Sequence, residues 1–434
     1  MAADLGSGSP ASRRGAPTGR SSLLSDTVLS TGGALGATLI AGIASILIAR
    51  ALGVTARGRW AVISSLAVLV GTLGATGLPI AAAYGAARLR GRERHRLIQA
   101  TGAAAIGLSA LAAVVYLGLA AILALPAPNA AVAVGAAIPL TMILYAVAHQ
   151  LTLTVSTMRW FAAIQLVNAA ATLGAVGALA AAGALTVLAV VTVSAGGASV
   201  GAVTSYVALR RSDAIGPRPW VWRPRTVAPV LRPYLAYSLM TFATLSLTQV
   251  VQRVDVLLIG GYRGPHAAGL YAVAVQVTDL MLVIPGALGL AMFRRGAHAA
   301  PSHYHDALLV LRFTALIGVV GAVLAFLLAG WALPLVFGSG YRGSVGAFRL
   351  LLPGTIAFSL QSVLSQYLAS RGRPRIVLIA WVTGAVTGLI ADLIVIPAAG
   401  VTGAAIVSSA SYVLVTVLHV HGFRAMRTTA TESR

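Results

Sequence analysis

Apolar runs of about 20 residues, long enough to cross ~30 Å of hydrocarbon as α-helices, recur along the whole chain. The composition agrees with this feature, because 58% of the 434 residues are hydrophobic and only 9% are charged. Soluble domains carry about 25% charged residues. The runs are apolar on all faces and do not alternate, which disfavours β-strands. The sequence therefore predicts an all-α polytopic membrane protein.

The apolar runs, taken between their polar breaks, predict about twelve transmembrane helices. The spans are roughly 28–49, 61–84, 98–124, 131–153, 161–182, 185–209, 234–260, 268–293, 307–334, 347–369, 375–397 and 401–421. Residues 1–22 are rich in Gly, Ser, Pro and Arg, which is typical of a disordered tail. They do not resemble a signal peptide, because the polar lead is long and the run after it is long enough to span.

Arginine provides all the basic side chains apart from histidine, and its distribution orients the predicted bundle. Cytoplasmic loops of membrane proteins carry an excess of positive charge. With the N-terminus inside, most arginines fall in inside segments, whereas the outside turns hold only Arg50, Arg57, Arg59, Arg263 and Arg342. This bias predicts that both chain ends lie in the cytoplasm. We attribute the net charge of +22 to topology and contact with anionic lipids, not to nucleic acid.

The sequence also contains an internal repeat that relates its two halves. Segment 50–62, RALGVTARGRWAV, resembles segment 261–273, GYRGPHAAGLYAV, at a constant offset of 211 residues. The offset pairs Gly53 with Gly264, Gly58 with Gly269 and Trp60 with Tyr271. A weaker echo relates 180–186 to 397–403.

The longest internal loop, 210–233, divides the predicted spans six and six. The sequence therefore predicts an N-lobe at 23–209, a cytoplasmic linker at 210–233, a C-lobe at 234–421 and a cytoplasmic tail at 422–434. Both lobes start on the same side of the membrane, so the repeat is parallel. Parallel repeats are typical of transporters whose central cavity opens alternately to each side.

The seventh predicted span carries opposite charges within an apolar run, VVQRVDVLLIG at 250–260. Intramembrane ionisable residues are costly and usually line pathways. Gln249 and Arg253 share a helix face, whereas Arg253 and Asp255 do not. One interpretation places Arg253 in a cavity, where it attracts an anionic cargo, with Gln249 and Asp255 as further binding candidates. The other is that Arg253 snorkels outward and Asp255 pairs with a neighbouring helix.

Acidic residues provide candidates for ion coupling. Asp279 lies near the midplane of the eighth span, with Gln276 on the same face as a further cargo-binding candidate. Asp279 could pair with Arg253 or carry H⁺ or Na⁺. Asp26, at the cytoplasmic start of the first span, is a second candidate, although the helix dipole alone favours an acid there. Asp392 in the eleventh span is a third.

The sequence predicts no resident cofactor or metal, and leaves H⁺ or Na⁺ coupling open. It contains no cysteine, so thiolate metal sites are excluded. Gln165 and Asn168 in the fifth span could bind sugar hydroxyls, but helix–helix hydrogen bonding is their favoured role. His149, in the fourth span, is interpreted in the same way.

Segment 253–289, RVDVLLIGGYRGPHAAGLYAVAVQVTDLMLVIPGALG, is similar to the seventh and eighth helices of Wzx-type polysaccharide flippases. Segments 49–62, 336–354 and 368–412 follow the pattern of the same family. The resemblance covers nearly the whole chain, although its motifs are diffuse and mostly Gly and apolar. These flippases belong to the MOP superfamily, together with the MATE drug exporters and the MurJ lipid II flippases.

The resemblance implies a MATE- or MurJ-like fold in the bacterial cytoplasmic membrane. It implies a flippase that moves undecaprenyl-pyrophosphate-linked oligosaccharide from the inner to the outer leaflet for cell-surface polysaccharide synthesis. Membrane lipids and a polysaccharide polymerase or glycosyltransferases are the implied partners. The basic cavity residues of such flippases favour Arg253, and the acids in the first helix of MATE exporters favour Asp26.

Three other classes of membrane protein fit the sequence less well than a flippase. A membrane polymerase or ligase would need a large outer loop, whereas the outer turns are short, and no nucleophile–base constellation is present. A major facilitator exporter would carry an Asp-Arg-x-Gly pattern that the basic segment 86–99 lacks. A MATE-like cation-coupled exporter of small organic molecules shares the fold and is the closest rival. Its cavity would be acidic, whereas Arg253 favours an anionic cargo.

Overall fold

The structure is a computed structural model, and it describes residues 20–212, 224–283, 285–286, 303–370 and 374–432. Within these ranges the chain is helical and contains no strand. In chain order the helices are α1 (Arg20–Gly74), α2 (Leu78–Arg88), α3 (Gly91–Ile122), α4 (Asn129–Gly135), α5 (Ala137–Val155), α6 (Met158–Ala181), α7 (Val187–Arg211), α8 (Pro224–Met281), α10 (His303–Phe337), the 3₁₀ helix η1 (Ser339–Gly343), α11 (Ser344–Ser370) and α12 (Pro374–Glu432).

Nine helices among the described residues are long and apolar enough to cross a membrane. Three of them are double, because α1 is kinked at Gly53, α8 at Gly264 and α12 at Gly400. The φ angles there are 72°, 81° and 57°, a left-handed region that glycine adopts with little strain. Dividing the three helices at their kinks gives the twelve spans that the sequence predicts.

Three predicted boundaries differ from the structure. The second span, predicted as 61–84, is interrupted at residues 75–77, where Thr76 and Gly77 have φ of 46° and 73°. A proline in the first turn of α2 favours a new helix start there. Residues 224–233, predicted as linker, already belong to α8, and α12 continues through most of the predicted C-terminal tail. Residues 1–19 of the predicted N-terminal tail and residues 213–223 of the predicted linker lie outside the described residues.

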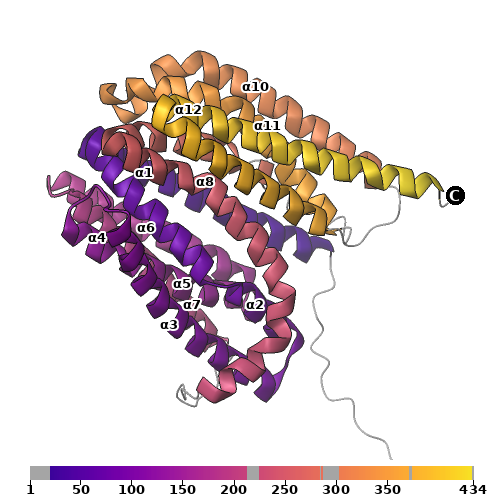
Figure 1. The fold of residues 1–434 in the computed structure, drawn as a ribbon. Helices are drawn as coiled ribbons and strands as arrows, with labels where there is room; N and C mark the ends of the chain where they lie inside the picture. Colours follow the sequence, from indigo (N-terminus) through magenta and orange to yellow (C-terminus); the bar gives the residue numbers. More distant parts are fainter. Residues whose placement is uncertain (1–19, 213–223, 284, 287–302, 371–373, 433–434) are drawn as a thin grey trace, which may run out of the picture.

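Helices α1 and α8 lie together in the middle of the molecule (Figure 1). Helices α3 to α7 gather on one side of this central pair, and α10 to α12 gather on the other (Figure 1). The outer helices carry large exposed apolar side chains, for example Leu111 on α3, Leu327 on α10 and Ile394 on α12. Such a surface matches the hydrocarbon of a bilayer. The central pair is therefore flanked by helices on both sides, although it also exposes apolar side chains such as Leu39 on α1 and Leu245 on α8.

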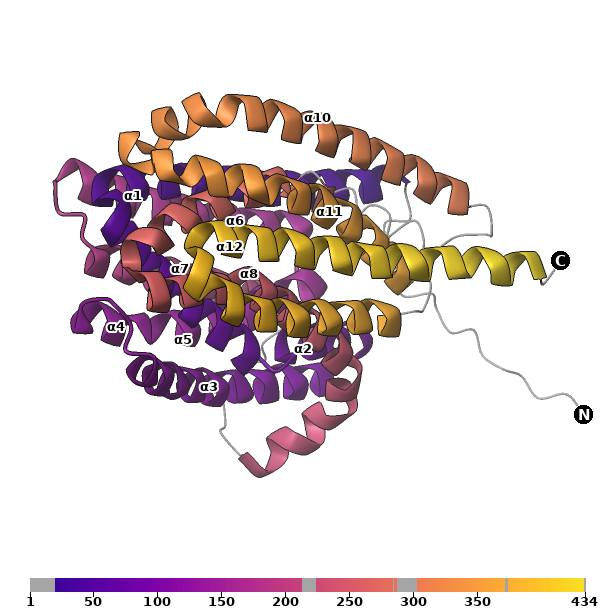
Figure 2. The same ribbon diagram turned by 45° about the horizontal axis from the view of Figure 1, so that its top comes forward.

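The kinks of α1, α8 and α12 turn the chain back at one end of the bundle, on the left in Figure 2. We call this the kink end. Arginine side chains support the helix ends that meet there. Arg50 donates hydrogen bonds to the carbonyl oxygens of Leu335 and Val336 at the end of α10. Arg263 donates to the carbonyl oxygens of residues 396–398, just before the kink of α12. A cation at these carbonyls complements the negative end of a helix.

The repeated glycines pack against each other at the kink end. A Cβ on Gly58 would lie 1.7 Å from the carbonyl oxygen of Pro265, and a Cβ on Gly269 would lie 2.0 Å from that of Val54. Thr55 Oγ1 lies 3.4 Å from His266 Nδ1. Each of these contacts relates residues of the two segments matched at the 211-residue offset. The post-kink halves of α1 and α8 therefore cross with approximate two-fold symmetry, and we call this contact the glycine crossing.

A cationic cavity between the central helices

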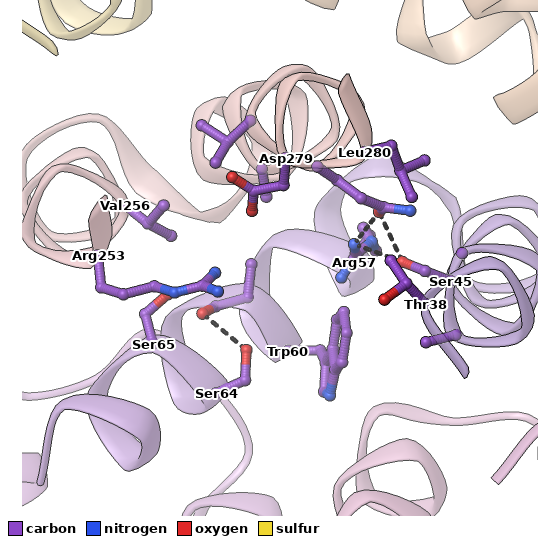
Figure 3. Close-up of a pocket in the computed structure, with 16 residues that line it drawn as sticks. Thr38, Ser45, Arg57, Trp60, Ser64, Ser65, Arg253, Val256, Asp279 and Leu280 are labelled. Carbon is purple, nitrogen blue, oxygen red and sulfur yellow. Dashed lines mark hydrogen bonds between the residues drawn. The ribbon is translucent and has the colours of Figure 1, made fainter. Parts of the chain in front are cut away.

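A cavity of ≈ 390 Å³ lies between α1 and α8. All of its lining residues come from these two helices, on both sides of each kink. The polar ones are Thr38, Ser45, Arg57, Trp60, Ser64, Ser65, Arg253, Gln276 and Asp279 (Figure 3). The lining therefore carries two guanidinium groups and one carboxylate. This balance suits an anionic ligand better than a cationic one.

Arg253 and Asp279 reach the cavity from the two halves of α8. Figure 3 shows the guanidinium of Arg253 and the carboxylate of Asp279 directed into the same space. Within the described part of the chain, no hydrogen bond or ion pair joins the two groups. The Nε of Arg253 is buried without a partner. A buried charged donor with no acceptor is costly, so this group is available to a ligand.

Arg57 is the functional side chain that the sequence analysis missed. It was predicted to lie in an outside turn, but it is 3% exposed and lines the cavity. The prediction was wrong because the helix resumes directly after Gly53 and carries Arg57 back into the bundle. The sequence signal that could have found Arg57 is Trp60, which lies three residues later and therefore on the same helix face.

The guanidinium of Arg57 joins the two central helices. Its Nη2 donates to Gln276 Oε1 at 2.7 Å and to Ser45 Oγ at 3.0 Å. Ser45 Oγ also donates to Gln276 Oε1, at 2.6 Å. The Cζ of Arg57 lies 4.1 Å from the centroid of the Trp60 ring, a cation–π distance. The Nε of Arg57 and the Nε2 of Gln276 remain buried without partners.

Asp255 lies away from the cavity, at the contact between α8 and α12. Its carboxylate accepts hydrogen bonds from Tyr271 Oη, from Ser408 Oγ at 3.1 Å and from the backbone N–H of Val256 at 2.7 Å. Asp255 is therefore not among the residues that line the cavity with Arg253, because residues two apart on a helix point in different directions. Its contact with α12 matches the alternative interpretation, in which Asp255 pairs with a neighbouring helix. Gln249 is also absent from the cavity lining, and its Oε1 is buried without a partner.

A second carboxylate approaches Asp255 from α12. Asp392 lines a pocket of ≈ 10 Å³ with Ser408 and Ser411, against valines of α8. It is 7% exposed, and its Oδ1 has no partner among the described residues. The pocket has about the volume of one water molecule. The third acid that the sequence singled out, Asp26, belongs to α1, but its side chain lies outside the described residues.

The polar residues of α5 and α6 contact each other. His149 lies 3.2 Å from Gln165, and its ring stacks on Phe161 with 4.1 Å between centroids. Asn168 packs against Gly197 and Gly201 of α7. These contacts agree with the helix–helix role that the sequence analysis favoured.

The fold is that of transporters of the MOP superfamily. A lipid II flippase, MurJ in an inward closed conformation, superposes with a TM-score of 0.72 at 11% identity, over 92% of this chain and 87% of that one. A multidrug resistance MATE family transporter in an inward-facing conformation gives 0.60 at 13% identity, over 91% and 96%. The eukaryotic MATE transporter AtDTX14 gives 0.60 at 13% identity, over 91% and 94%. At such identities the likeness concerns the fold alone.

A family model described as polysaccharide biosynthesis protein matches residues 23–293. The chain therefore belongs to the polysaccharide biosynthesis protein family. No curated protein matches it significantly. Together with the helices that are long and apolar enough to cross a membrane, the fold and the family match indicate a multi-pass membrane protein. By name, the structural neighbours include a lipid II flippase and multidrug transporters.

Proposed function

We propose that this protein flips undecaprenyl-pyrophosphate-linked oligosaccharide from the inner to the outer leaflet of the cytoplasmic membrane. The buried cationic cavity between α1 and α8 is the observation that carries the proposal. A glycan with a diphosphate is large, polar and anionic, so it cannot cross hydrocarbon unaided. Guanidinium groups match phosphate oxygens in charge and geometry. The polyprenyl tail needs no cavity, because it can stay in the bilayer.

Alternating access between the predicted lobes would move the cargo. The lobes at 23–209 and 234–421 are joined through α1 and α8, whose kinks lie at the predicted outer end. The glycine crossing closes the cavity toward that end. Rocking of the lobes about this contact would open the cavity outward and release the cargo to the outer leaflet.

We assign ion coupling to Asp279, the acid that lines the cavity, and keep Asp392 as the alternative. Asp279 faces Arg253 across the cavity, so a proton or Na⁺ at Asp279 would change the charge that the cargo meets. Asp392 is the alternative because its Oδ1 has no hydrogen-bond partner among the described residues and it lines a small pocket with Ser408 and Ser411. Both sites consist of oxygen ligands, which suit hard cations. A polymerase or glycosyltransferase would supply or consume the lipid-linked glycan.

The runner-up function is a MATE-like exporter of organic cations. Asp279 in the cavity and the shared fold favour it. The two arginines in the same cavity oppose it, since a like charge repels a cationic cargo.

The test measures lipid-linked oligosaccharide in cells that lack the protein and are complemented with wild type or Arg253→Ala. The undecaprenyl-linked precursor should accumulate on the cytoplasmic side, and wild type should clear it. Arg253→Ala should clear it about tenfold more slowly or worse, as expected for loss of a charged hydrogen-bond donor.

Arg312→Ala, on the exposed surface of α10, is the matched control and should behave as wild type. Unchanged precursor together with increased sensitivity to cationic dyes would replace the flippase by the exporter. Equal clearance by wild type and Arg253→Ala would remove Arg253 from the cargo path.

A further inference from the structure

The two cavity arginines differ in their hydrogen bonding. Arg253 has no hydrogen-bond partner within the described residues, whereas Arg57 is held by Ser45 and Gln276. Arg57 and Ser45 belong to α1, on opposite sides of its kink, and Gln276 belongs to α8. The hydrogen bond from Arg57 to Gln276 therefore bridges the two predicted lobes. It lies one residue from Gly58, where the backbones of the two helices meet.

This bridge is incompletely satisfied. Arg57 is 3% exposed, yet its Nε has no acceptor and Gln276 Nε2 has none either. Buried polar groups are nearly always paired, so two orphans in one contact require an explanation. The amide oxygen is also a neutral acceptor. An anion offers a charge-assisted hydrogen bond about twice as strong as a neutral one.

We propose that Arg57 is a cargo-sensing latch, which closes the kink end by bonding Gln276 and releases it when an anionic cargo binds the guanidinium. The inference rests on the proposed function and names the cargo group, a diphosphate or another phosphate-like anion. Arg253 attracts the anion into the cavity, and Arg57 then exchanges Gln276 for it. Trp60 keeps the guanidinium in place during the exchange. Loss of this hydrogen bond leaves the glycine crossing without the polar contact that holds it closed.

The experiment measures closure directly. The chain contains no cysteine, so Thr55→Cys with His266→Cys introduces the only thiols, at side chains 3.4 Å apart across the crossing. The rate of oxidative cross-linking in proteoliposomes reports the closed population. Undecaprenyl pyrophosphate is the probe, with inorganic pyrophosphate as the arm that separates a lipid-linked anion from a free one.

In the protein that carries Thr55→Cys and His266→Cys, undecaprenyl pyrophosphate should slow cross-linking several-fold. Without any probe, Arg57→Gln and Gln276→Leu should already slow it about tenfold, the effect of losing a hydrogen bond to a charged group. The probe should then have no further effect on Arg57→Gln. Arg57→Lys should restore part of the closure, and Arg59→Gln, two residues away and outside the cavity lining, should match the parent. Size-exclusion profiles establish that each variant is folded.

Cross-linking of Arg57→Gln at the parent rate without probe would overturn the latch. So would a probe effect that persists in Arg57→Gln, or a parent that responds to neither undecaprenyl pyrophosphate nor inorganic pyrophosphate. The proposed function is judged separately, by precursor clearance in cells. A flippase in which Arg57 is not a latch would clear the precursor but fail the cross-linking test. A protein with the latch but a different cargo would pass the cross-linking test and leave the precursor unchanged.

Discussion

At the scale of single residues, the same side chain has different roles according to which helix face carries it. Arg50 and Arg263 bind helix carbonyls, Arg57 bridges two helices, and the Nε of Arg253 has no partner among the described residues. Position explains the division, because the exposed Arg50 and Arg263 reach helix carbonyls at the kink end. The buried Arg57 instead lies beside Ser45 and Gln276. The unpaired one is therefore the strongest indication of a ligand.

Tyr271 provides a residue-scale prediction about stability. Its hydroxyl donates to Asp255 and lies 3.0 Å from Ser408, so Tyr271→Phe leaves a buried carboxylate short of a donor. The unfolding free energy should fall by about 1–3 kcal/mol, measured as a lower melting temperature of the purified protein in detergent. Tyr262→Phe, exposed on the same helix, is the control and should melt like wild type. Equal melting of both variants would show that the contact contributes no stability.

At the scale of elements, glycine determines where the long helices turn and how closely they cross. Gly53 and Gly264 have nearly the same backbone angles, φ 72° with ψ 175° and φ 81° with ψ 171°. The repeat that was visible in the sequence is therefore also a repeat in backbone geometry. Gly58 and Gly269 then remove the side chains that would keep the two halves apart.

Gly58→Ala tests the close crossing. The added Cβ would lie 1.7 Å from the Pro265 carbonyl oxygen, so the helices must separate, at a cost of about 1–3 kcal/mol. The melting temperature should fall. Gly261→Ala is the matched control, because its Cβ meets nothing within 4 Å and alanine favours a helix. If Gly58→Ala were as stable as Gly261→Ala, the crossing would be looser than the structure shows.

At the scale of the whole molecule, charge and apolar surface divide the protein into regions. Arg88, Arg210 and Arg211 end α2 and α7 at the end opposite the kinks, whereas the kink-end residues Arg50 and Arg263 bind carbonyls. The positive-inside rule therefore assigns the kink end to the outside. The cavity between α1 and α8 is lined by residues from both sides of each kink.

Ion coupling is tested on the whole transporter. Transport of lipid-linked oligosaccharide into proteoliposomes should accelerate under an imposed H⁺ or Na⁺ gradient. Asp279→Asn should abolish this acceleration, because its carboxylate faces the cargo cavity. Asp392→Asn removes an acid that does not line the cavity, and it should retain the gradient response. The reverse outcome would place coupling in the α8–α12 pocket, and no response of wild type to either gradient would exclude coupling to these ions.

The sequence by itself determined the membrane class, the twelve spans and the repeat. Span length, charge bias and glycine spacing are local properties, readable along one chain. It also singled out Arg253, Gln276 and Asp279, which the structure brings to one cavity.

Only the tertiary structure decided which charges share a site. Asp255 is two residues from Arg253, yet it binds Tyr271 and Ser408 on another face. Arg57 comes from a different half of the chain, yet it reaches Gln276. The physical reason is that a helix separates near neighbours by rotation, whereas a glycine kink returns distant segments to the same place. Residue spacing fixes the first effect, and packing between helices alone fixes the second.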